Sequence, residues 1–583
     1  MEVAPAATEL LQKAQKIAAK FDFGPEQANT AVAHLVQHLD SALRNESTTQ
    51  IPSFITSLPT GTETGVFLGV DLGGTNCRVC SVQLHGDSTY TLLQQAREIP
   101  RSVMTEHSYM PLFLFIAQCI ADFLAANAHL TSPDTAGSQT SPQRLPLGFI
   151  FSFTFEQHSL ARGVLLQWDK GWAIPMAIGR DPCQMLQEAV DTLELPVSVC
   201  ALANDSVGTL LARAYTHPTN PPTLMGAIFG TGTNAAYAER LSRIQKLGFK
   251  ADAVPSTGQD LMLMNTEWGG CFDDNTAALS STQYDQVLDR ESTNPAQQTL
   301  EKRTSGLYLG ELLRLALVDL LKAELFRFTI KDSTTCPLLK RYQLDSELLS
   351  VFAGDSSLDL AESIKVAADR LQVSGLTLQD AQAIRTIAMA IGRRAGRISG
   401  VAVAGIIIQS GRVSKSRAGT MPLKATETQP PKSLARKTRD PRENDATGCT
   451  AIFKSLYQFL RRICGSTSPP APTHPCSQEA KAAPKLNAMP QTSSPTLSST
   501  TTAVFSTDSE SETDVGVIDI GVDGSLIEYY PSFEEHLRSA LRDIADVGVA
   551  GEQRVKIGLA KNGSSIGAAI AALYQSRELG EEI

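Results

Sequence analysis

Two glycine-rich segments of the sequence have the composition of phosphate-binding turns. The first, residues 69–78, reads Gly-Val-Asp-Leu-Gly-Gly-Thr-Asn-Cys-Arg and lies between two apolar runs. Backbone N–H groups of such a turn can face phosphate oxygens, and the side chains of Thr75, Asn76 and Arg78 add further donors. The second, residues 230–234, reads Gly-Thr-Gly-Thr-Asn and also follows an apolar run. Together they predict a phosphate-bearing ligand, with plain hairpin turns as the alternative interpretation.

Three carboxylates follow or end apolar runs, at positions where phosphoryl transfer to a hydroxyl would need them. Asp71 ends the first run and could hold Mg²⁺ through water. Asp205 follows the run 197–203, at a predicted strand-to-helix junction. A hydroxyl that attacks a phosphoryl group needs a positioned base, and the remaining catalysis is charge stabilisation. Glu267 precedes Trp268, and carboxylates and amides are the groups that bind sugar hydroxyls, although a lone Glu-Trp pair is more often structural.

Two other groupings have metal-ligand chemistry but favour plainer interpretations. Cys77 and Cys80 form a lone CxxC inside an apolar strand, which is weak evidence for redox or zinc chemistry. His34 and His38 stand four apart on a predicted helix, a spacing that can hold a metal ion. No glutamate follows the first histidine as in an HExxH motif. Two solvated histidines are therefore the preferred interpretation, and no protein metal site is predicted.

The elements that must position these groups follow from the apolar pattern. Buried strands are predicted at residues 66–70, 79–84, 145–153, 197–203 and 224–229. Helices are predicted at residues 5–45 (one or two helices), 111–126, 307–328 and 383–404, the last rich in small residues and suited to close packing. Residues 52–65 are expected to form a linker.

The composition limits the class of protein and the kinds of partner that fit these motifs. The chain has 583 residues, 42% hydrophobic and 19% charged, with a net charge of −10. It has no apolar stretch near the roughly 20 residues of a membrane span and no apolar signal core at its start. The net negative charge lacks the basic footprint of a nucleic-acid-binding protein. Ten scattered cysteines fit a reducing compartment. We expect a cytoplasmic globular protein with no membrane or nucleic-acid partner.

A change of composition near Gly411 marks an insert. Residues 413–514 are rich in Ser, Thr, Pro and basic residues and predict a low-complexity, disordered segment. Within it, residues 450–464 predict a short amphipathic helix that could dock on the body, a protein partner or a membrane surface. The basic cluster at residues 432–442 is typical of a solvated tail, and a nuclear address is the alternative.

Taken in order, these segments resemble the eukaryotic hexokinase family and specifically a divergent fungal-type member. The resemblance extends to residues 147–153, 157–163, 168–172, 294–311 and 522–531, and covers about residues 60–412 and 515–580. It implies a two-lobed actin-like ATPase (ribonuclease-H-like) α/β fold. The large lobe would comprise residues 1–61, 204–412 and 515–565. The small lobe would comprise residues 62–203 and 566–583, with residues 413–514 as a surface insert.

The resemblance also implies a function, ATP-dependent hexose 6-phosphotransfer with glucose as the favoured hexose. ATP would be the cofactor, with Mg²⁺ held mainly through the nucleotide. The implied catalytic residues are Asp205, as general base, and Lys170. The implied sugar contacts are Ser159, Asp169, Lys170, Asn204, Asp205, Asn234, Glu267, Gln298 and Glu301. The implied nucleotide contacts are Asp71, Gly73, Gly74, Thr75, Asn76, Arg78, Thr231, Gly524 and Ser564.

Departures from the family pattern, together with the long insert, keep a second function open, and they include Lys561 and Asn562 where the family has Glu-Asp. Asp169 stands where the family has threonine, and two like charges about 4 Å apart cost on the order of 4 kcal/mol at an effective dielectric near 20. Thr154 replaces a proline. Ser565 and Ala296 replace glycines, which carries a penalty wherever φ must be positive. The alternative is therefore a hexokinase-like sugar sensor or regulator with weak or no catalytic activity, for which the insert is the candidate site for a protein partner.

Overall fold

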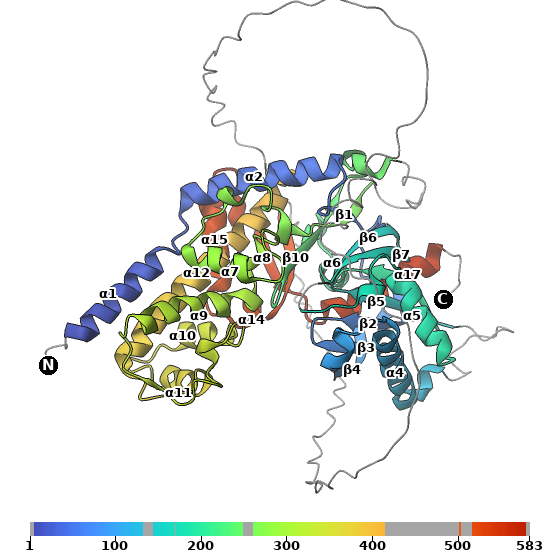
Figure 1. Ribbon diagram of the computed structural model, residues 1–583. Helices are drawn as coiled ribbons and strands as arrows, with labels where there is room; N and C mark the ends of the chain where they lie inside the picture. The colour runs from blue at the N-terminus through green and yellow to red at the C-terminus, as the bar shows by residue number, and fades with distance from the viewer. Residues whose placement is uncertain are drawn as a thin grey trace, which may run out of the picture. The chain divides into compact units, whose positions relative to one another are not determined.

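The computed structural model describes residues 5–131, 144–168, 171–248, 260–413, 501–502 and 516–578, with the backbone alone at 501–502 (Figure 1). Asp169, Lys170, the basic cluster and the predicted amphipathic helix lie outside these ranges, as does nearly all of the predicted insert. No helix in the ranges given is long and apolar enough to cross a bilayer.

One six-stranded sheet carries the first glycine turn. Its order is β14-β4-β3-β2-β5-β8, with bounds β2 Thr64–Leu72, β3 Asn76–His85, β4 Tyr90–Glu98, β5 Leu145–Phe151, β8 Val197–Ala203 and β14 Thr501–Thr502. Strands β2 to β4 form an antiparallel meander, and β5 and β8 extend it in parallel. The β-branched pair Thr501–Thr502 joins the open edge of β4, so this part of the predicted disordered insert is paired.

A second six-stranded sheet repeats this design and carries the second glycine turn. Its order is β1-β11-β10-β9-β15-β16, with bounds β1 Ile51–Pro52, β9 Met225–Phe229, β10 Thr233–Glu239, β11 Met262–Asn265, β15 Ile518–Asp523 and β16 Val555–Leu559. Again a three-stranded antiparallel meander is extended by two parallel strands. The turn between β2 and β3 and the turn between β9 and β10 therefore occupy equivalent places in the two sheets.

Two helices cross between the sheets. Helix α6 (Asp205–Thr216) follows β8 but packs on β9, β10 and β15, whereas α17 (Gly563–Glu578) follows β16 but packs on β2, β5 and β8. They meet where a Cβ on Gly567 would lie 2.1 Å from the Cα of Gly208, so only glycine fits there. Arg213 fixes α6 to its sheet by donating from Nε and Nη2 to the buried Asp519 carboxylate, at 3.0 and 2.6 Å.

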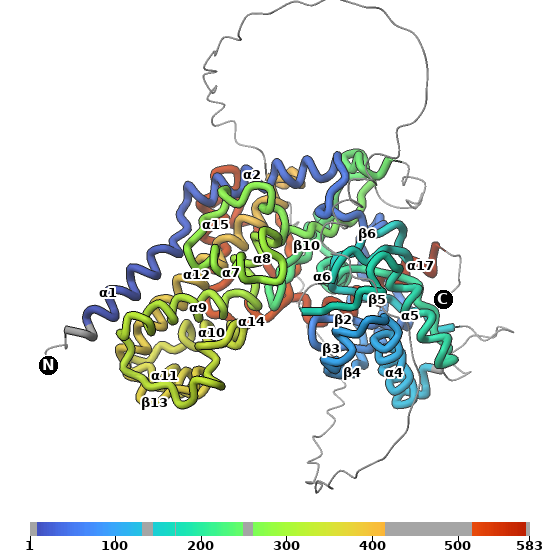
Figure 2. Tube along the Cα trace, viewed as in Figure 1, coloured from blue at the N-terminus to red at the C-terminus, as the bar shows by residue number. Residues whose placement is uncertain are grey.

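A helical layer packs around α12 (Leu378–Gln409) (Figure 2). This helix is buried along most of its length. A Cβ on Gly400 would lie 2.4 Å from the Leu537 carbonyl oxygen, which confirms the predicted close packing of this small-residue helix. The neighbours of α12 include α1 Pro5–Ala19, α2 Pro25–Arg44, α8 Glu301–Thr304, α9 Gly306–Lys322, α10 Glu347–Gly354, α11 Ala361–Arg370 and α15 Phe533–Asp543.

The remaining elements are short or lie around the first sheet. They are α3 Arg101–Met104, α4 Met110–Ala126, α5 Pro182–Thr192, α7 Gln283–Glu291, α14 Ser525–Tyr529, α16 Gly548–Glu552, β6 Thr154–Ser159, β7 Arg162–Gln167, β12 Thr329–Ile330 and β13 Val373–Ser374. Strands β6 and β7 form a separate hairpin. Helices α4 and α5 pack together beside the first sheet.

Two predicted elements differ from the structure. The helix predicted to reach residue 328 ends at Lys322, because Glu324 takes the left-handed conformation (φ 54°) that terminates helices. The expected linker is largely buried, since Phe54, Ile55 and Leu58 pack into the core and β2 begins at Thr64. Apolar side chains in a proline-rich segment therefore had more influence than its turn-forming residues.

Candidate active site

A cavity of about 1250 Å³ is lined by residues from both sheets. Most of the predicted site residues line it, namely Asp71, Gly73, Gly74, Thr75, Asn76, Arg78, Asn204, Asp205, Thr231, Asn234, Glu267, Gln298, Glu301, Gly524 and Ser564. Ser159, on β6, is not among the lining residues, so the cavity gives no support to its predicted sugar contact.

The first glycine turn is closed by backbone and side-chain hydrogen bonds. The Gly73 N–H donates to the Asn76 carbonyl at 3.1 Å, and the Trp172 indole N–H donates to the Gly74 carbonyl at 3.1 Å. Arg78 lies opposite Asp71 in the β2–β3 ladder and donates to its Oδ2 at 2.9 Å. The Arg78 side chain stays 48% exposed, so its positive charge remains available at the cavity wall.

The second glycine turn packs directly on the turn that follows β15. The Gly230 N–H donates to the Gly232 carbonyl at 3.0 Å, and the Gly306 N–H at the start of α9 donates to the Gly230 carbonyl at 2.8 Å. Gly524 has φ 114°, and a Cβ there would lie 2.5 Å from the carbonyl carbon and oxygen of Phe229. Glycine is therefore required at 524, and two backbone turns present their polar groups at one place.

An amide network surrounds the Glu267 carboxylate. The Asn234 Nδ2 lies within hydrogen-bonding distance of Glu267 Oε1 (3.1 Å), Asn265 Oδ1 (2.8 Å) and Asn204 Oδ1 (3.1 Å). The Asn265 Nδ2 donates to Glu267 Oε1 at 2.8 Å. The backbone N–H of Ala235 donates to Asn234 Oδ1 at 2.8 Å and so fixes the orientation of that amide. A fixed carboxylate–amide set of this kind suits recognition of several hydroxyl groups.

Asn265 was not identified from the sequence. It lies two residues before Glu267, at the end of β11. Glu267 itself lies beyond the strand in the left-handed conformation (φ 47°), so strand periodicity could not have paired the two residues, and the turn brings them together.

Asp205 is the first residue of α6, directly after the helix cap. The Asn204 Oδ1 caps the helix by accepting from the Ser206 N–H at 2.9 Å and its hydroxyl at 2.7 Å. The same Ser206 N–H also lies 2.9 Å from Asp205 Oδ1. A carboxylate here is stabilised by the positive end of the helix dipole. The cap and the helix start therefore hold Asp205 at the cavity wall.

Asp523 is a further cavity carboxylate, and it is not among the predicted site residues. It ends β15, as Asp71 lies near the end of β2, and its Oδ1 accepts from the Gly524 N–H at 2.7 Å. Burial raises the pKa of Asp523 to about 6, and the negative charges of Asp205 and Asp71 add to this rise. The signal in the sequence was an aspartate followed by glycine at the end of an apolar run.

An aromatic cluster forms another part of the wall. The Trp168 and Trp172 rings are stacked with centroids 5.4 Å apart, and Phe153 meets Trp168 edge-on at 4.7 Å. Both tryptophans line the cavity, whereas Trp268 is fully buried and donates to the Thr233 hydroxyl at 3.1 Å. Trp168 and Trp172 are therefore intrinsic fluorescent probes of ligand binding.

Comparison with known proteins identifies the family of this chain. Hexokinase family models match residues 13–215 and residues 224–427 together with 434–574. A glucokinase from Aspergillus niger is 36% identical over 98% of both chains, and hexokinase-1 from Saccharomyces cerevisiae is 36% identical over 69% of this chain and 80% of its own. A Schistosoma mansoni hexokinase solved with glucose has a TM-score of 0.68 at 25% identity, covering 97% of this chain and 99% of that one. The chain belongs to the hexokinase family and has its two-lobed actin-like ATPase fold.

The two glycine replacements have different structural consequences. Ser565 lies within α17 with an ordinary helical backbone, so the free-energy cost expected for a positive φ is absent there. Ala296 has φ 61°, in the left-handed region, and its N–H donates to Asp289 Oδ1 at 3.0 Å. The replacement that strains the backbone is therefore Ala296, near the predicted sugar contact Gln298, and not Ser565, near the predicted nucleotide contacts.

Replacing Ala296 by glycine should raise the free energy of unfolding by up to about 1 kcal/mol. An L-residue in the left-handed region costs about 1–2 kcal/mol, and the greater freedom of glycine in the unfolded chain offsets part of this gain. Urea unfolding measures the change. The matched control is Ser565→Gly, which replaces a residue within a helix by the poorer helix former and should lower stability by about 0.5 kcal/mol. Destabilisation by Ala296→Gly would contradict the assignment of strain.

Proposed function

We propose that this protein is an ATP-dependent hexose 6-phosphotransferase that phosphorylates glucose in the cytoplasm, the first step of glycolysis. The observation that carries the proposal is a single cavity in which the amide-supported Glu267, the capped Asp205 and two glycine turns all meet. Relatives named glucokinase and hexokinase at 30–36% identity support the same activity.

The hydrogen-bond donors that line the cavity suit a nucleoside triphosphate. Backbone N–H groups of the two glycine turns, with Thr75 and the Arg78 guanidinium, match the oxygens of a phosphate chain. The close packing of Gly524 on Phe229 leaves no room for a side chain where the second glycine turn meets the turn after β15. Mg²⁺ supplies positive charge to the phosphates and would be held mainly through the nucleotide, with Asp71 beside it.

The chain's own residues then account for the reaction. Glu267, Asn234 and Asn204 would orient the sugar hydroxyls. Asp205 would accept the 6-hydroxyl proton while that oxygen forms its bond to the γ-phosphorus and ADP departs. The turns and Arg78 would stabilise the charge that develops on the transferred group. Lys170 and Asp169 remain predicted contacts from the family resemblance alone.

The deciding experiment follows hexose 6-phosphate and ADP together, with purified full-length protein, glucose and Mg-ATP. Turnover within about 1–1000 s⁻¹, with the two products in equal amounts, would support the kinase. The same samples report sugar binding through the fluorescence of Trp168 and Trp172. A glucose-dependent fluorescence change without product would overturn the kinase and favour the sugar sensor, for which Asp169 is the motivating departure.

Replacing Glu267 by glutamine should raise the KM for glucose about 10- to 100-fold. The substitution removes a charged acceptor and points an N–H₂ group at amides that now donate to Oε1, and a hydrogen bond to a charged group is worth about 1.5–3 kcal/mol. Steady-state kinetics and fluorescence titration with glucose measure the change. Glu362→Gln, on the exposed surface of α11, is the control and should leave KM unchanged. An unchanged KM in Glu267→Gln would remove Glu267 from the sugar site.

A further inference from the structure

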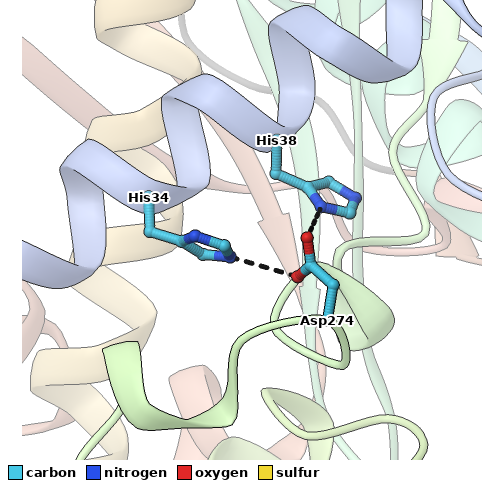
Figure 3. A group of neighbouring side chains, drawn as sticks. All are labelled: His34, His38 and Asp274. Atoms are coloured by element: carbon cyan, nitrogen blue, oxygen red, sulfur yellow. Dashed lines mark ion pairs between the residues drawn. The ribbon is translucent and has the colours of Figure 1, made fainter. Parts of the chain in front are cut away.

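Two histidines on α2 share the carboxylate of one aspartate from a distant segment (Figure 3). The Nε2 of His34 lies 3.3 Å from Oδ1 of Asp274, and the Nδ1 of His38 lies 3.6 Å from Oδ2 of the same side chain. All three ligand atoms lie within 4.8 Å of one another. Sequence spacing alone favoured two solvated histidines, but the fold supplies a third ligand more than 230 positions away.

Both rings are held in place by their surroundings. Their side chains are only 14% and 17% exposed, and α2 is anchored by a buried apolar face that includes Leu35 and Leu39. The His34 ring packs against Phe272, with centroids 5.1 Å apart. The Nε2 of His38 lies 3.1 Å from the Thr49 hydroxyl, which orients Nδ1 toward Asp274. Metal-bound histidines characteristically have such a partner on the second ring nitrogen.

The spacing matches a small, tetrahedral divalent ion. With bonds of about 2.0–2.1 Å, neighbouring ligand atoms around zinc lie about 3.3 Å apart. The two histidine nitrogens lie near this distance from different oxygens of Asp274, His34 Nε2 at 3.3 Å from Oδ1 and His38 Nδ1 at 3.6 Å from Oδ2. One ligand atom from each residue falls within a 4.8 Å set, and the 61% exposed Asp274 side chain can turn to close the remaining distance when an ion binds. The Cys271 carbonyl oxygen, 3.3 Å from His34 Nε2, offers a further oxygen beside the three side chains.

We propose that His34, His38 and Asp274 form a binding site for a divalent transition metal of the zinc class. Two imidazole nitrogens and one carboxylate oxygen suit Zn²⁺, whereas the hard ions Mg²⁺ and Ca²⁺ prefer all-oxygen ligands. The ion completes its shell with water or the Cys271 carbonyl. The site is separate from the Mg-ATP position, and it does not depend on the proposed kinase activity.

The bound ion connects α2 to the segment that positions the sugar network. Asp274 lies seven residues after Glu267, and the neighbouring Asp273 accepts from the backbone N–H groups of Gln298 and Thr299, each at 2.8 Å. Metal binding therefore fixes the turn that joins two predicted sugar contacts. Because the ion binds the folded chain, it also raises the melting temperature.

The test is a zinc titration of the full-length, untagged protein after removal of metals, in competition with a chromophoric chelator and without sugar or nucleotide. We expect one ion per chain, bound at micromolar or lower concentration, and a melting temperature raised by several degrees. His34→Gln, His38→Gln and Asp274→Asn should each weaken binding at least tenfold. Circular dichroism in excess chelator checks that each variant is folded.

His158→Gln is the matched control, because His158 also faces a carboxylate, Glu156, at 3.4 Å but has no second imidazole there. It should bind zinc like the unmodified protein. Cobalt provides a second readout, since nitrogen and oxygen ligands give weak visible bands whereas thiolates add a strong near-ultraviolet band. Equal zinc binding by His34→Gln and the unmodified protein would overturn the site, as would a thiolate band showing that cysteines hold the ion.

Discussion

Replacing Asp205 by asparagine should lower kcat by about 10²- to 10⁴-fold, the usual contribution of a general base. Asparagine keeps an oxygen that can accept the Ser206 N–H, which lies 2.9 Å from Oδ1, so the start of α6 is preserved. The amide cannot take a proton from the 6-hydroxyl. Because only the proton acceptor is removed, the loss should appear in kcat while the glucose dissociation constant changes little.

Two measurements separate this effect from damage to the fold. Glucose titration through Trp168 and Trp172 fluorescence should give near-normal binding, and urea unfolding should give near-normal stability. Asp205→Ala serves as a harsher companion, because it loses both the base and the oxygen beside the Ser206 N–H. If Asp205→Asn retained more than a tenth of normal kcat, another group would have to be the base.

Replacing Asp523 by asparagine should stabilise the ligand-free protein, and more so as pH rises. Burial raises the pKa of Asp523 from its ordinary value near 3.8 to about 6, so the folded state binds this proton more tightly than the unfolded chain. Stability is therefore lost as pH rises from about 4 through 6. A shift of about two pH units corresponds to about 3 kcal/mol. Asparagine can still accept the Gly524 N–H and carries no charge.

Urea unfolding in the absence of nucleotide and Mg²⁺ measures this effect. The advantage of Asp523→Asn should be about 3 kcal/mol at pH 7.5 and about half of that at pH 5. Asp355→Asn is the opposite-sign control. The hydroxyls of Ser357 and Ser363 hold the pKa of Asp355 below its usual range, so its contribution to stability is lost as pH falls. A pH-independent gain in Asp523→Asn would show that repulsion and burial of the charge are not its cause.

Local sequence patterns predict the parts of the site that are contiguous in the chain. The apolar runs around residues 69–78 become β2 and β3, and their glycines form the turn between them. Asn204 becomes a helix cap and Asp205 the first helical residue, as expected for a strand-to-helix junction. These features depend on strand periodicity and capping, which act over a few residues.

Features that depend on long-range packing could not be predicted in the same way. Asp523 gains its raised pKa because the fold buries it, and because the charges of Asp205 and Asp71 reach the same cavity from other elements. His34 and His38 gain Asp274 from a segment far along the chain. The strain at Ala296 depends on a backbone conformation that no spacing reveals. In each case the sequence shows the residue type, whereas its surroundings or backbone conformation depend on the tertiary structure.

The position of α17 has a consequence for synthesis on the ribosome. This helix is built from residues 563–578, yet it covers one face of the sheet whose strands β2 to β8 end at Ala203, with the Ala568 backbone against Gly148. At about 5–20 residues per second, the covering helix is made roughly 20–75 seconds after that sheet. The apolar face of the sheet that contains β2 to β8 therefore stays exposed to solvent until α17 has been synthesised. A nascent chain in this condition is a natural client for chaperones, and truncation near the C-terminus would damage the part of the molecule that is synthesised first.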